Sequence, residues 1–590
     1  MLSYRKLAMR VLGRPLHTGG GIDSPRPASQ RAAALVLTAA MLTTFTAPAF
    51  AKTWYIENGD ITISAGKTEG TNKVSQGSTT DEEDTDTVIT NNNRDTASSH
   101  TVTIEAGNDK VEVTLDNVNI KADSGSALTS NGDVTLTLKG DNHLTGGNGG
   151  SSSYGGDGIT SSGSLTISGG TVTATGGDST SSVGSGGSGI YSVSGDVTIS
   201  GGTVNANGGD GKNGSGGGSG IDSSGGVTVS GGTVTANGGD GGSGSGSHGG
   251  NGIYSSSGVA ISGGAVTANG GDSKDGSGGN GIYSSGGVTI SSGSTVTANG
   301  VNGEDGSGGR GITSNGGVTV SGGTVNAKGG SGKNGNGGDG IRSFNPVAIS
   351  GGTVNANGGN SDYSNGGDGI RSLDHVAISG GTVKSNGGSG NLSGGNGIIS
   401  YDIDLSGSLE LTAKAGSPNG KALLQAGHEL DLDAIKDKLD PGAKVTATDA
   451  DGKVIQQVSI PRPVEPEEPV IPEESSSSSD GGSATPSAPA SFLPGLTVTD
   501  KDGQRISYTS TQSGNTLTIC VGRLTASLRA SLSALRQLRA EGIETITFQT
   551  ILCSTTLSVD ELLAMGGEDA EVVLTHHIRS STLTVGGRAV

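Results

Sequence analysis

The sequence predicts an all-β solenoid, a right-handed parallel β-helix of roughly 10 to 12 coils, followed by a small α+β module. The first observation is a repeated Gly-Ile dipeptide, with isoleucine at positions 159, 190, 221, 253, 282, 312, 341, 370 and 398. The second is the alternation of apolar and polar residues within each repeat, as in Leu165-Thr166-Ile167 and Val172-Thr173-Ala174. A period of about 30 residues indicates stacked repeats, and alternation is typical of strands with one buried face.

Each repeat is expected to contain three short strands, which in the first repeat fall around Ile159, Leu165–Ile167 and Thr171–Ala174. One such repeat cannot bury its apolar face, but stacked coils pair each strand with its copies above and below. The apolar positions then form interior rows, for example Val197, Val227, Val259, Val288, Val318, Val347 and Val376. Right-handedness follows the usual chirality of parallel crossover connections.

Disorder is the alternative, because 113 of the 590 residues are glycine and low-complexity Gly/Ser/Asn segments usually do not fold. Disorder does not explain why isoleucine, valine and alanine keep their places while the intervening segments vary. The net charge of −20 argues against a nucleic-acid-binding protein, which needs a basic surface. Aromatic residues make up only 3 %, so stacked small residues must supply most of the core.

Residues 1–51 resemble an export signal. Arg26 and Arg31 precede an apolar stretch of about 15 residues at 32–46, short for a membrane span, and Ala49-Phe50-Ala51 has the small-x-small pattern of a cleavage site. We expect a mature protein that begins near Lys52, is secreted or on the cell surface, and has no membrane span after cleavage. The alternative is a retained anchor helix.

The remaining chain divides into five parts. Residues 52–119 are expected to form an N-terminal cap and first coils, 120–413 the β-helix repeats, and 414–460 a closing cap with a short helix at 430–439 and a strand at 444–457. Residues 461–494 form a Pro/Glu/Ser-rich linker, and 495–590 form the α+β module.

In the module, Leu524, Leu528, Leu535 and Leu538 have helical spacing, and Ser558 with Glu561 makes a capping box for a second helix. Cys520 and Cys553 are the only cysteines, and either a disulfide after export or two separate thiols fits the sequence.

One stretch of the sequence resembles a known family. The run KVEVTLDNVNI is followed by SGSAL, DVTLTLKGDNHLTGG, GGDGI and SLTISGGTVTATGG, an order similar to that of the bacterial carbohydrate-binding β-helix family first described from cellulolytic clostridia. The resemblance covers about residues 53–415. It implies a secreted or surface β-helix that binds plant polysaccharides and calcium.

The residue after each opening isoleucine should point outward, because side chains alternate along a strand. This column holds Tyr191, Tyr254, Tyr283, Arg342 and Arg371 as candidate ligand-binding residues. Exposed tyrosine rings can pack on sugar rings, and arginines can bind uronate carboxylates through paired hydrogen bonds. The alternative is that the column only stabilises the stacking of strands. A further column of asparagines, one before a glycine in most coils, is expected to form structural amide rows.

Two sets of aspartates are candidate calcium ligands, because calcium binds several carboxylate and carbonyl oxygens in flexible geometry. They are Asp178, Asp210, Asp240 and Asp272 in the turns of four successive coils, and Asp157, Asp339 and Asp368 just before three Gly-Ile openings. Solvated loop tips are the alternative for both sets.

No feature favours an enzyme, because the acidic residues recur as columns instead of forming one irregular cluster, and the histidines are scattered. The sequence therefore predicts a non-catalytic monomer that binds plant or acidic polysaccharide, with possible help from calcium. The first alternative is a structural surface stalk or adhesin that contacts host or neighbouring proteins. The second is a polysaccharide lyase.

Overall fold

The computed structural model describes residues 51–462 except 151–153, 181–183, 213 and 245, and residues 496–589 except 501–503, 507, 514, 522, 524, 551–553, 566–570, 577–580 and 587. They fall into two compact units, within 1–466 and 467–590, which are described separately. The expected signal peptide (apart from residue 51), the linker (apart from 461 and 462) and Cys553 lie outside the described residues.

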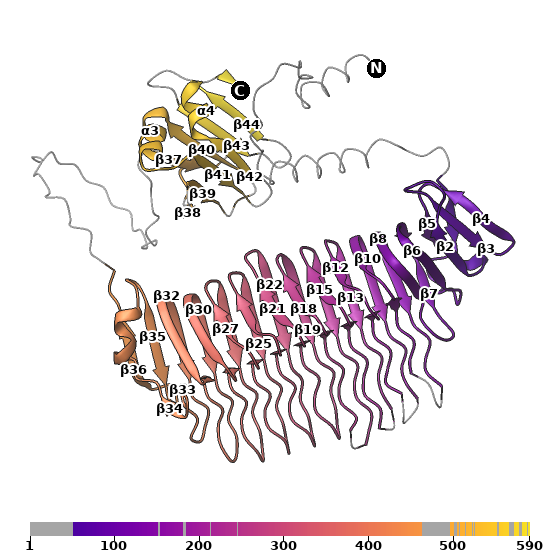
Figure 1. Cartoon of the computed structure of the whole chain (residues 1–590), viewed down its shortest axis with the longest axis horizontal. Coiled ribbons are helices and arrows are strands. Elements are labelled where there is room, and N and C mark those ends of the chain that lie inside the picture. The colour runs from indigo at the N-terminus through magenta and orange to yellow at the C-terminus, as the bar shows by residue number, and fades with distance from the viewer. Residues whose placement is uncertain are drawn as a thin grey trace, which may run out of the picture. The chain divides into compact units, whose positions relative to one another are not determined.

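The first unit is a parallel β-solenoid of about 14 turns, which confirms the predicted fold class (Figure 1). There are more turns than the 10 to 12 expected, because segments at both ends that lack the Gly-Ile opening also stack on the repeats. Leu128 in β8 pairs with Ile159, and Leu423 in β33 pairs with Ile398. The handedness of the solenoid stays a prediction.

The N-terminal end combines a small antiparallel cap with the first coils. Its elements are β1 (Thr53–Tyr55), η1 (Ile56–Asn58), β2 (Ile61–Ala65), β3 (Asn72–Gln76), β4 (Thr79–Asp84), β5 (Val88–Thr90), β6 (Val102–Asp116), β7 (Asn119–Lys121) and β8 (Leu128–Thr145). Strands β2, β3 and β4 pair antiparallel, while β1 pairs parallel with β5, and β5 with β6. The sole tryptophan, Trp54, is buried in this cap, as expected.

Each repeat contributes one strand to each of three parallel ladders. The opening ladder contains β9 (Ile159–Ser161), β11 (Ile190–Ser192), β14 (Ile221–Ser223), β17 (Ile253–Ser255), β20 (Ile282–Ser284), β23 (Ile312–Ser314), β26 (Ile341–Ser343), β29 (Ile370–Ser372), β31 (Ile398–Ser400) and β33 (Leu423–Gln425). Its strands pair in register, so each opening isoleucine lies beside the isoleucine of the next coil.

The second ladder contains β12 (Val197–Ile199), β15 (Gly226–Val229), β18 (Gly258–Ile261), β21 (Gly287–Ile290), β24 (Val318–Val320) and β27 (Val347–Ile349). The third ladder contains β13 (Thr203–Asn207), β16 (Thr233–Asn237), β19 (Gly264–Asn269), β22 (Ser294–Asn299), β25 (Thr324–Lys328), β28 (Thr353–Asn357) and β35 (Lys444–Thr448). Three longer strands run through both ladders: β10 (Leu165–Thr175), β30 (His375–Asn386) and β32 (Asp402–Lys414).

The C-terminal end closes with β34 (His428–Glu429), the 3₁₀ helix η2 (Asp433–Lys438), and the antiparallel pair β35 and β36 (Val454–Ser459). The 3₁₀ helix falls inside the segment predicted to be helical. The expected strand across 444–457 is instead a hairpin, because Asp449 and Gly452 form a tight turn in which the Asp449 carboxylate accepts from the backbone of Asp451 and Lys453.

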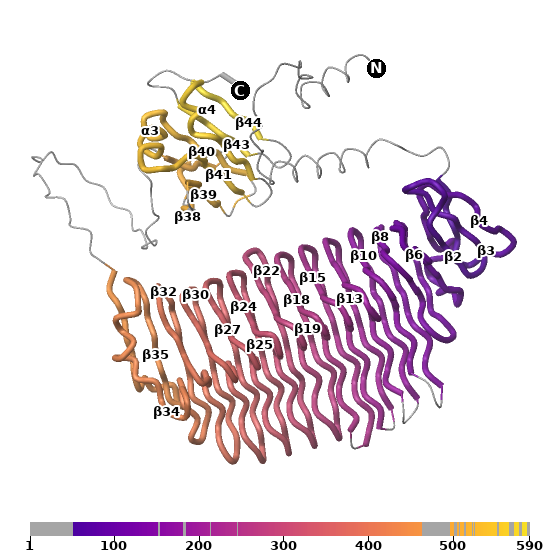
Figure 2. The backbone as a smooth tube through the Cα atoms, viewed as in Figure 1, coloured from indigo at the N-terminus to yellow at the C-terminus, as the bar shows by residue number. Residues whose placement is uncertain are grey.

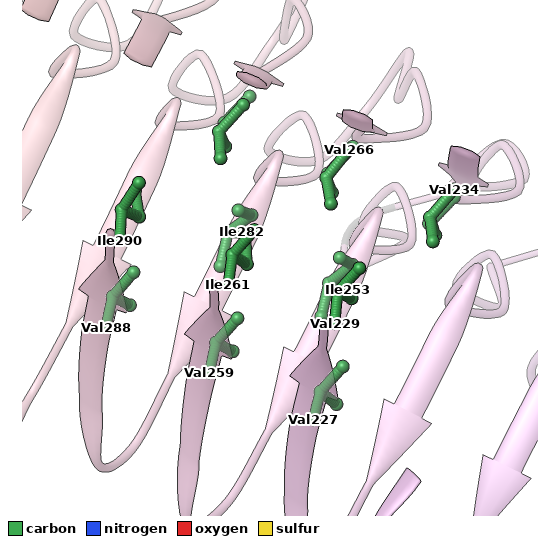
Figure 3. Close-up of a cluster of buried hydrophobic side chains, with 14 of the residues drawn as sticks. Val227, Val229, Val234, Ile253, Val259, Ile261, Val266, Ile282, Val288 and Ile290 are labelled. Carbon is green, nitrogen blue, oxygen red and sulfur yellow. The ribbon is translucent and has the colours of Figure 1, made fainter. Parts of the chain in front are cut away.

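Interior rows of branched aliphatic side chains hold the coils together. The predicted valine row from Val197 to Val376 is paired in register and buried throughout. Figure 3 shows three adjacent coils, in which Val227 and Val229 lie beside Val259 and Ile261, and these beside Val288 and Ile290. Stacking identical positions buries each apolar face on both sides, which one repeat cannot achieve alone.

Glycine-rich segments, which we call the return segments, connect the third ladder of each coil to the opening ladder of the next. The return segments of successive coils run side by side (Figure 2). Their backbones bond directly to one another: Gly209 N donates to Gly187 O, and Gly239 N donates to Gly218 O, each at 2.8 Å. A Cβ atom on Gly218 would lie 1.9 Å from Gly187 O, so only glycine permits this approach. The high glycine content therefore belongs to a packed structure.

Buried serines satisfy polar groups at the corner after each opening strand. Ser192 Oγ donates to Gly195 O at 2.7 Å, and Ser255 Oγ contacts Gly225 O at 2.8 Å and Gly258 O at 2.9 Å. The predicted asparagine rows are also confirmed, since Asn269 Nδ2 donates to Asn237 Oδ1, and Asn299 Nδ2 donates to Asn269 Oδ1, both at 2.8 Å. The serine bonds satisfy backbone carbonyl groups that are buried away from water, and the asparagine bonds link the side chains of successive coils.

The second unit is a small α+β domain with two sheets. One sheet contains β37 (Leu496–Thr499), β40 (Ala526–Ser531), β43 (Glu571–His576), β44 (Ser581–Val585) and β45 (Arg588–Ala589), and the other contains β38 (Thr509–Ser513), β39 (Thr516–Cys520), β41 (Thr545–Gln549) and β42 (Ser554–Ser558). Its helices are α3 (Leu532–Ala540) and α4 (Val559–Ala564). The serine half of the predicted capping box is confirmed, because Ser558 is the N-cap of α4 and its side chain accepts from Glu561 N.

The prediction that Leu528 belongs to the first helix is wrong. Leu528 lies in β40, where Ala526, Leu528 and Ala530 are buried in alternation, and the helix begins only after Ser531 caps it. Leu524 lies outside the described residues. The four-residue interval between Leu524 and Leu528 fits a helix, but it is also a multiple of the two-residue period of a strand. Cys520 is free and half-buried, with its Sγ atom 3.4 Å from Gln549 Oε1.

We expect Gly218→Ala to lower the free energy of unfolding by roughly 1–3 kcal/mol, the usual cost of overpacking, because its Cβ would meet backbone atoms that cannot turn aside. Gly201→Ala is the matched control, since no atom lies within 4 Å of the added Cβ. Urea unfolding followed by far-UV circular dichroism measures both. Equal midpoints for the two variants would contradict this account of the glycine-rich segments.

Candidate functional site

The candidate site is the outward surface of the opening ladder, which we call the opening-strand face. It consists of two columns. The outward column follows each opening isoleucine and holds Thr160, Tyr191, Asp222, Tyr254, Tyr283, Thr313, Arg342, Arg371 and Ile399. The preceding column lies two residues before each isoleucine and holds Asp157, Ser188, Ser219, Asn251, Asn280, Arg310, Asp339, Asp368 and Asn396. Strand pairing makes both columns run coil by coil along one face.

The five predicted ligand-binding residues therefore share one face but do not form one cluster. Tyr254 pairs with Tyr283, and Arg342 pairs with Arg371. Asp222 lies between Tyr191 and Tyr254, and Thr313 separates the tyrosine pair from the arginines. The face is thus divided into an acidic N-terminal part, a tyrosine-bearing middle part and an arginine-rich C-terminal part.

In the middle part, the rings of Tyr254 and Tyr283 stack with centroids 5.3 Å apart and planes 8° from parallel. Each ring therefore covers one face of the other, and both side chains remain partly exposed. Asn315 Nδ2 lies 3.4 Å from the Tyr283 hydroxyl. Stacked rings on successive coils stabilise the ladder, so this pair has a structural role whether or not it meets a ligand.

A polar cavity of about 330 Å³ lies across three successive coils that carry the tyrosine pair. His248, Asn251, Asn280 and Arg310 line it together with glycines and serines of the return segments. Asn251 and Asn280 stand three residues before Tyr254 and Tyr283, in the preceding column. Sequence reasoning missed these residues, although Asn251, Asn280 and Arg310 recur at one place in the repeat and could have been found as a second column.

Hydrogen bonds hold the cavity's amide groups in place. Asn251 Oδ1 accepts from Asn280 N at 3.1 Å and from Asn280 Nδ2 at 2.9 Å, and Asn280 Oδ1 accepts from Arg310 N at 2.9 Å. His248 Nδ1 accepts from Ser277 N at 3.0 Å. Each amide oxygen thus binds the backbone of the next coil, which orients the side chains before any ligand arrives.

In the C-terminal part, the predicted arginines and two of the predicted calcium ligands form a single charge network. Arg371 Nη1 lies 3.2 Å from Asp368 Oδ2, and Arg342 Nη1 lies 3.6 Å from Asp339 Oδ2. Arg310, which the sequence analysis did not select, places its Nε 3.4 Å from Asp339 Oδ2. Both carboxylates are buried, so their first role is to balance the arginines.

Burial and the close spacing of charges in this network shift the pKa values of its members. Burial raises the pKa of Asp368 to about 6, and the nearby Asp339 carboxylate adds to the rise while Arg371 opposes it. Burial also lowers the pKa of Arg342, and the positive charges of Arg310 and Arg371 contribute. Three arginines thus face two carboxylates, which gives this part of the face an excess of positive charge on an acidic protein.

In the N-terminal part, Asp157 and Asp222 lie on either side of Tyr191. Asp157 Oδ2 accepts from Thr160 Oγ1 at 2.6 Å, and its Oδ1 accepts from Ser188 N at 2.7 Å. Burial raises the pKa of Asp222 to about 6, and repulsion from Asp157 contributes. Burial and the two carboxylates also raise the pKa of Tyr191.

Three of the other four predicted calcium ligands bind the backbone nitrogen of the next aspartate, and the fourth, Asp272, donates its own backbone N–H. Asp178 Oδ1 accepts from Asp210 N at 3.0 Å, Asp210 Oδ1 from Asp240 N at 2.9 Å, and Asp240 Oδ1 from Asp272 N at 2.8 Å. Calcium needs six to eight oxygen ligands. Among the described residues no group of three or more His, Cys, Asp or Glu side chains is placed to hold a metal ion. As they stand, these columns do not form a calcium cage.

In the second unit, His576 is buried and does not resemble a metal ligand. Its Nε2 lies 2.9 Å from Thr555 Oγ1, its Nδ1 lies 3.2 Å from Thr550 Oγ1, and its ring packs against Phe548. Burial lowers the pKa of His576, so the ring is held neutral. Its neighbour at 577 lies outside the described residues.

Comparison with known proteins supports the fold. A family model described as a beta helix repeat matches residues 165–189, 197–219, 227–251 and 347–370. Curated proteins gave no match to this chain, and solved structures gave none either. A parallel β-helix repeat protein is consistent with a surface-binding or structural role. No helix in the described part of the chain is long and apolar enough to cross a membrane.

We expect the stability of the solenoid to fall between about pH 4 and pH 6, because Asp222 holds its proton more tightly when folded, with a pKa of about 6, than its ordinary pKa of 3.8. The folded state then binds more protons in this window, so raising the pH favours unfolding. Asp222→Asn should match the wild type at pH 4 and exceed it above pH 6 by about 1–2 kcal/mol.

Urea unfolding of residues 52–460 at pH 4, 5, 6 and 7 measures this effect. Tyr191→Phe is the control, because it keeps both carboxyls and should keep the pH dependence. A difference between wild type and Asp222→Asn that does not change with pH would contradict the assignment of the titration to Asp222.

Proposed function

We propose that this protein binds polysaccharide outside the cytoplasm, without cleaving it, through the opening-strand face. The observation that carries the proposal is the polar cavity of about 330 Å³ on the coils that carry the Tyr254–Tyr283 pair. Sugar binding sites combine aromatic surface, which packs on the apolar side of a sugar ring, with amides and charged groups that bond to its hydroxyls. Asn251, Asn280, His248 and Arg310 supply the polar groups.

The arginine-rich part supports a preference for acidic polysaccharide. Arg310, Arg342 and Arg371 exceed their two carboxylate partners in charge, and guanidinium groups bind carboxylates through paired hydrogen bonds. A chain of uronates lying along the solenoid would meet the cavity first and the arginines on the following coils. Phe344, 45 % exposed beside Arg342, adds an aromatic surface there.

Calcium is a separate part of the proposal. The Asp turns are already bonded to the backbone, so a calcium ion would have to take further oxygens from the polysaccharide. Chelator in the binding assay tests this point without affecting the tyrosine pair.

A structural stalk or adhesin is the second candidate, and one observation favours it. The tyrosine rings cover each other, and the carboxyl and amide groups of both columns bond mainly to the next coil. These contacts stabilise a long rigid solenoid without any ligand. The two candidates differ in whether a soluble glycan binds at all.

We expect affinity electrophoresis of residues 52–460 to show retardation in gels that contain pectate, xylan or a soluble cellulose derivative. The triple variant Tyr191→Ala, Tyr254→Ala, Tyr283→Ala and the variant Asn251→Ala, Asn280→Ala should each weaken binding about tenfold or more, as loss of central contacts does. Tyr363→Ala is the matched control, because Tyr363 is 62 % exposed on a return segment away from this face.

Three other outcomes of this binding assay would each point to a different site or function. Retardation lost only with chelator would move the site to the Asp turns. Release of unsaturated sugars, detected by absorbance, would indicate a lyase. No retardation on any of the three glycans would contradict the proposal within that panel and favour the stalk.

A further inference from the structure

Asp84, at the end of β4, is a fully buried carboxylate in the N-terminal cap. Both of its oxygens accept hydrogen bonds. Trp54 Nε1 donates to Oδ2 at 2.7 Å, and the backbone nitrogens of Lys52 and Asp86 each donate to Oδ1 at 3.2 Å. The carboxylate is therefore the point at which the first residues of the cap are attached to β4.

Asp84 takes part in none of the ion pairs found among the described residues. The nearby Lys52 Nζ pairs instead with Glu82 Oε2 at 2.6 Å and lies 4.0 Å over the Trp54 ring. A buried carboxylate is costly unless it is both hydrogen-bonded and paired with positive charge. Asp84 has the hydrogen bonds, but among the residues that the structure describes it has no cationic partner.

One of the three donors can become a cation. The indole of Trp54 and the amide of Asp86 stay neutral, but the Lys52 nitrogen becomes an amine if the bond before it is cut. Ala49-Phe50-Ala51, directly before Lys52, has the pattern that signal peptidases cleave. In that hydrolysis the Ala51–Lys52 C–N bond breaks, the hydroxyl of water joins the Ala51 carbonyl carbon, and the remaining proton of water goes to the Lys52 nitrogen. The new Ala51 carboxylic acid then loses its proton, and the Lys52 amine takes one up to become ammonium.

We propose that Asp84 is the binding site for the N-terminal ammonium of Lys52, which forms when a peptidase removes the preceding segment. The nitrogen is already 3.2 Å from Oδ1, so cleavage makes the donor of this hydrogen bond cationic and turns the contact into an ion pair without moving the chain. Lys52 O accepts from Val88 N at 3.4 Å, and Thr53 pairs with Val88 in β5, so the new terminus is held beside Asp84.

The consequence is a cap that becomes fully stable only after processing. Strand β1 pairs with β5, and β5 with β6, so the cap covers the end at which the coils begin. A precursor that still carries residues 49–51 keeps an uncompensated charge at this end. The mature chain has a closed end, which blocks the exposed edge at which solenoids otherwise add to one another. This inference does not depend on carbohydrate binding.

The test compares two full-length chains that end at Val590, one starting at Lys52 and one starting at Ala49. Trp54 is the only tryptophan and touches Asp84, so its fluorescence reports opening of the cap directly. We expect the opening equilibrium constant to be about tenfold smaller for the chain that starts at Lys52, because the hydrogen bond to the carboxylate then has a cationic donor in place of a neutral one. Asp84→Asn should bring the two forms to nearly the same value.

Glu82→Gln is the matched control, because it removes the pair with the Lys52 side chain and should leave the difference between the two starts unchanged. The comparison of the two unsubstituted chains remains decisive if Asp84→Asn does not fold. Equal opening constants for the two starts would overturn the proposal, as would a difference that persists in Asp84→Asn. N-terminal sequencing of the exported protein should find Lys52 first, and any other first residue would also overturn it.

Discussion

The structure depends on one constraint: every coil must return its backbone to the same position one rung further along the stack. In a parallel ladder each backbone group then meets its counterpart in the next coil, so almost any residue that differs in size or conformation affects two neighbours. The constraint is strictest in the return segments, where Gly218 lies too close to Gly187 O for any side chain to fit. Glycine is abundant here because coils that pack backbone against backbone have no room for a Cβ atom.

The same repetition determines the chemistry of the surface. A residue type that occupies one outward position appears on successive rungs about 4.8 Å apart, so identical charges are brought together. The chain meets this problem in two ways. In the Asp178 to Asp272 column, the first three carboxylates each bind the next backbone nitrogen, and in the C-terminal coils Arg342 and Arg371 stand beside Asp339 and Asp368. At Asp222 and Asp368 burial and a neighbouring carboxylate outweigh these contacts and raise the pKa of each carboxyl to about 6.

The repeat period, the three strands and the interior rows could be predicted from the sequence, because apolar alternation survives wherever one strand face is buried. The individual contacts of the site could not. Arg310, Asn251 and Asn280 were missed because their column holds serine, asparagine, aspartate and arginine in different coils, so no single residue type marks it. The role of the Asp columns was also not visible, since the same spacing that suggests a cation site places each carboxylate beside the next coil's N–H group. At Leu528 local spacing fitted both a helix and a strand, and pairing with β43 decided between them.

The central claim is that the opening-strand face is where a polysaccharide binds. The most direct measurement is a crystal structure of residues 52–460 with a bound uronate oligosaccharide. The account predicts sugar density in the cavity on the coils that carry Tyr254 and Tyr283, with polar contacts to Asn280 and Arg310 and the sugar chain extending toward Arg342. Sugar bound elsewhere on the solenoid or at either cap, with this cavity empty, would contradict the account.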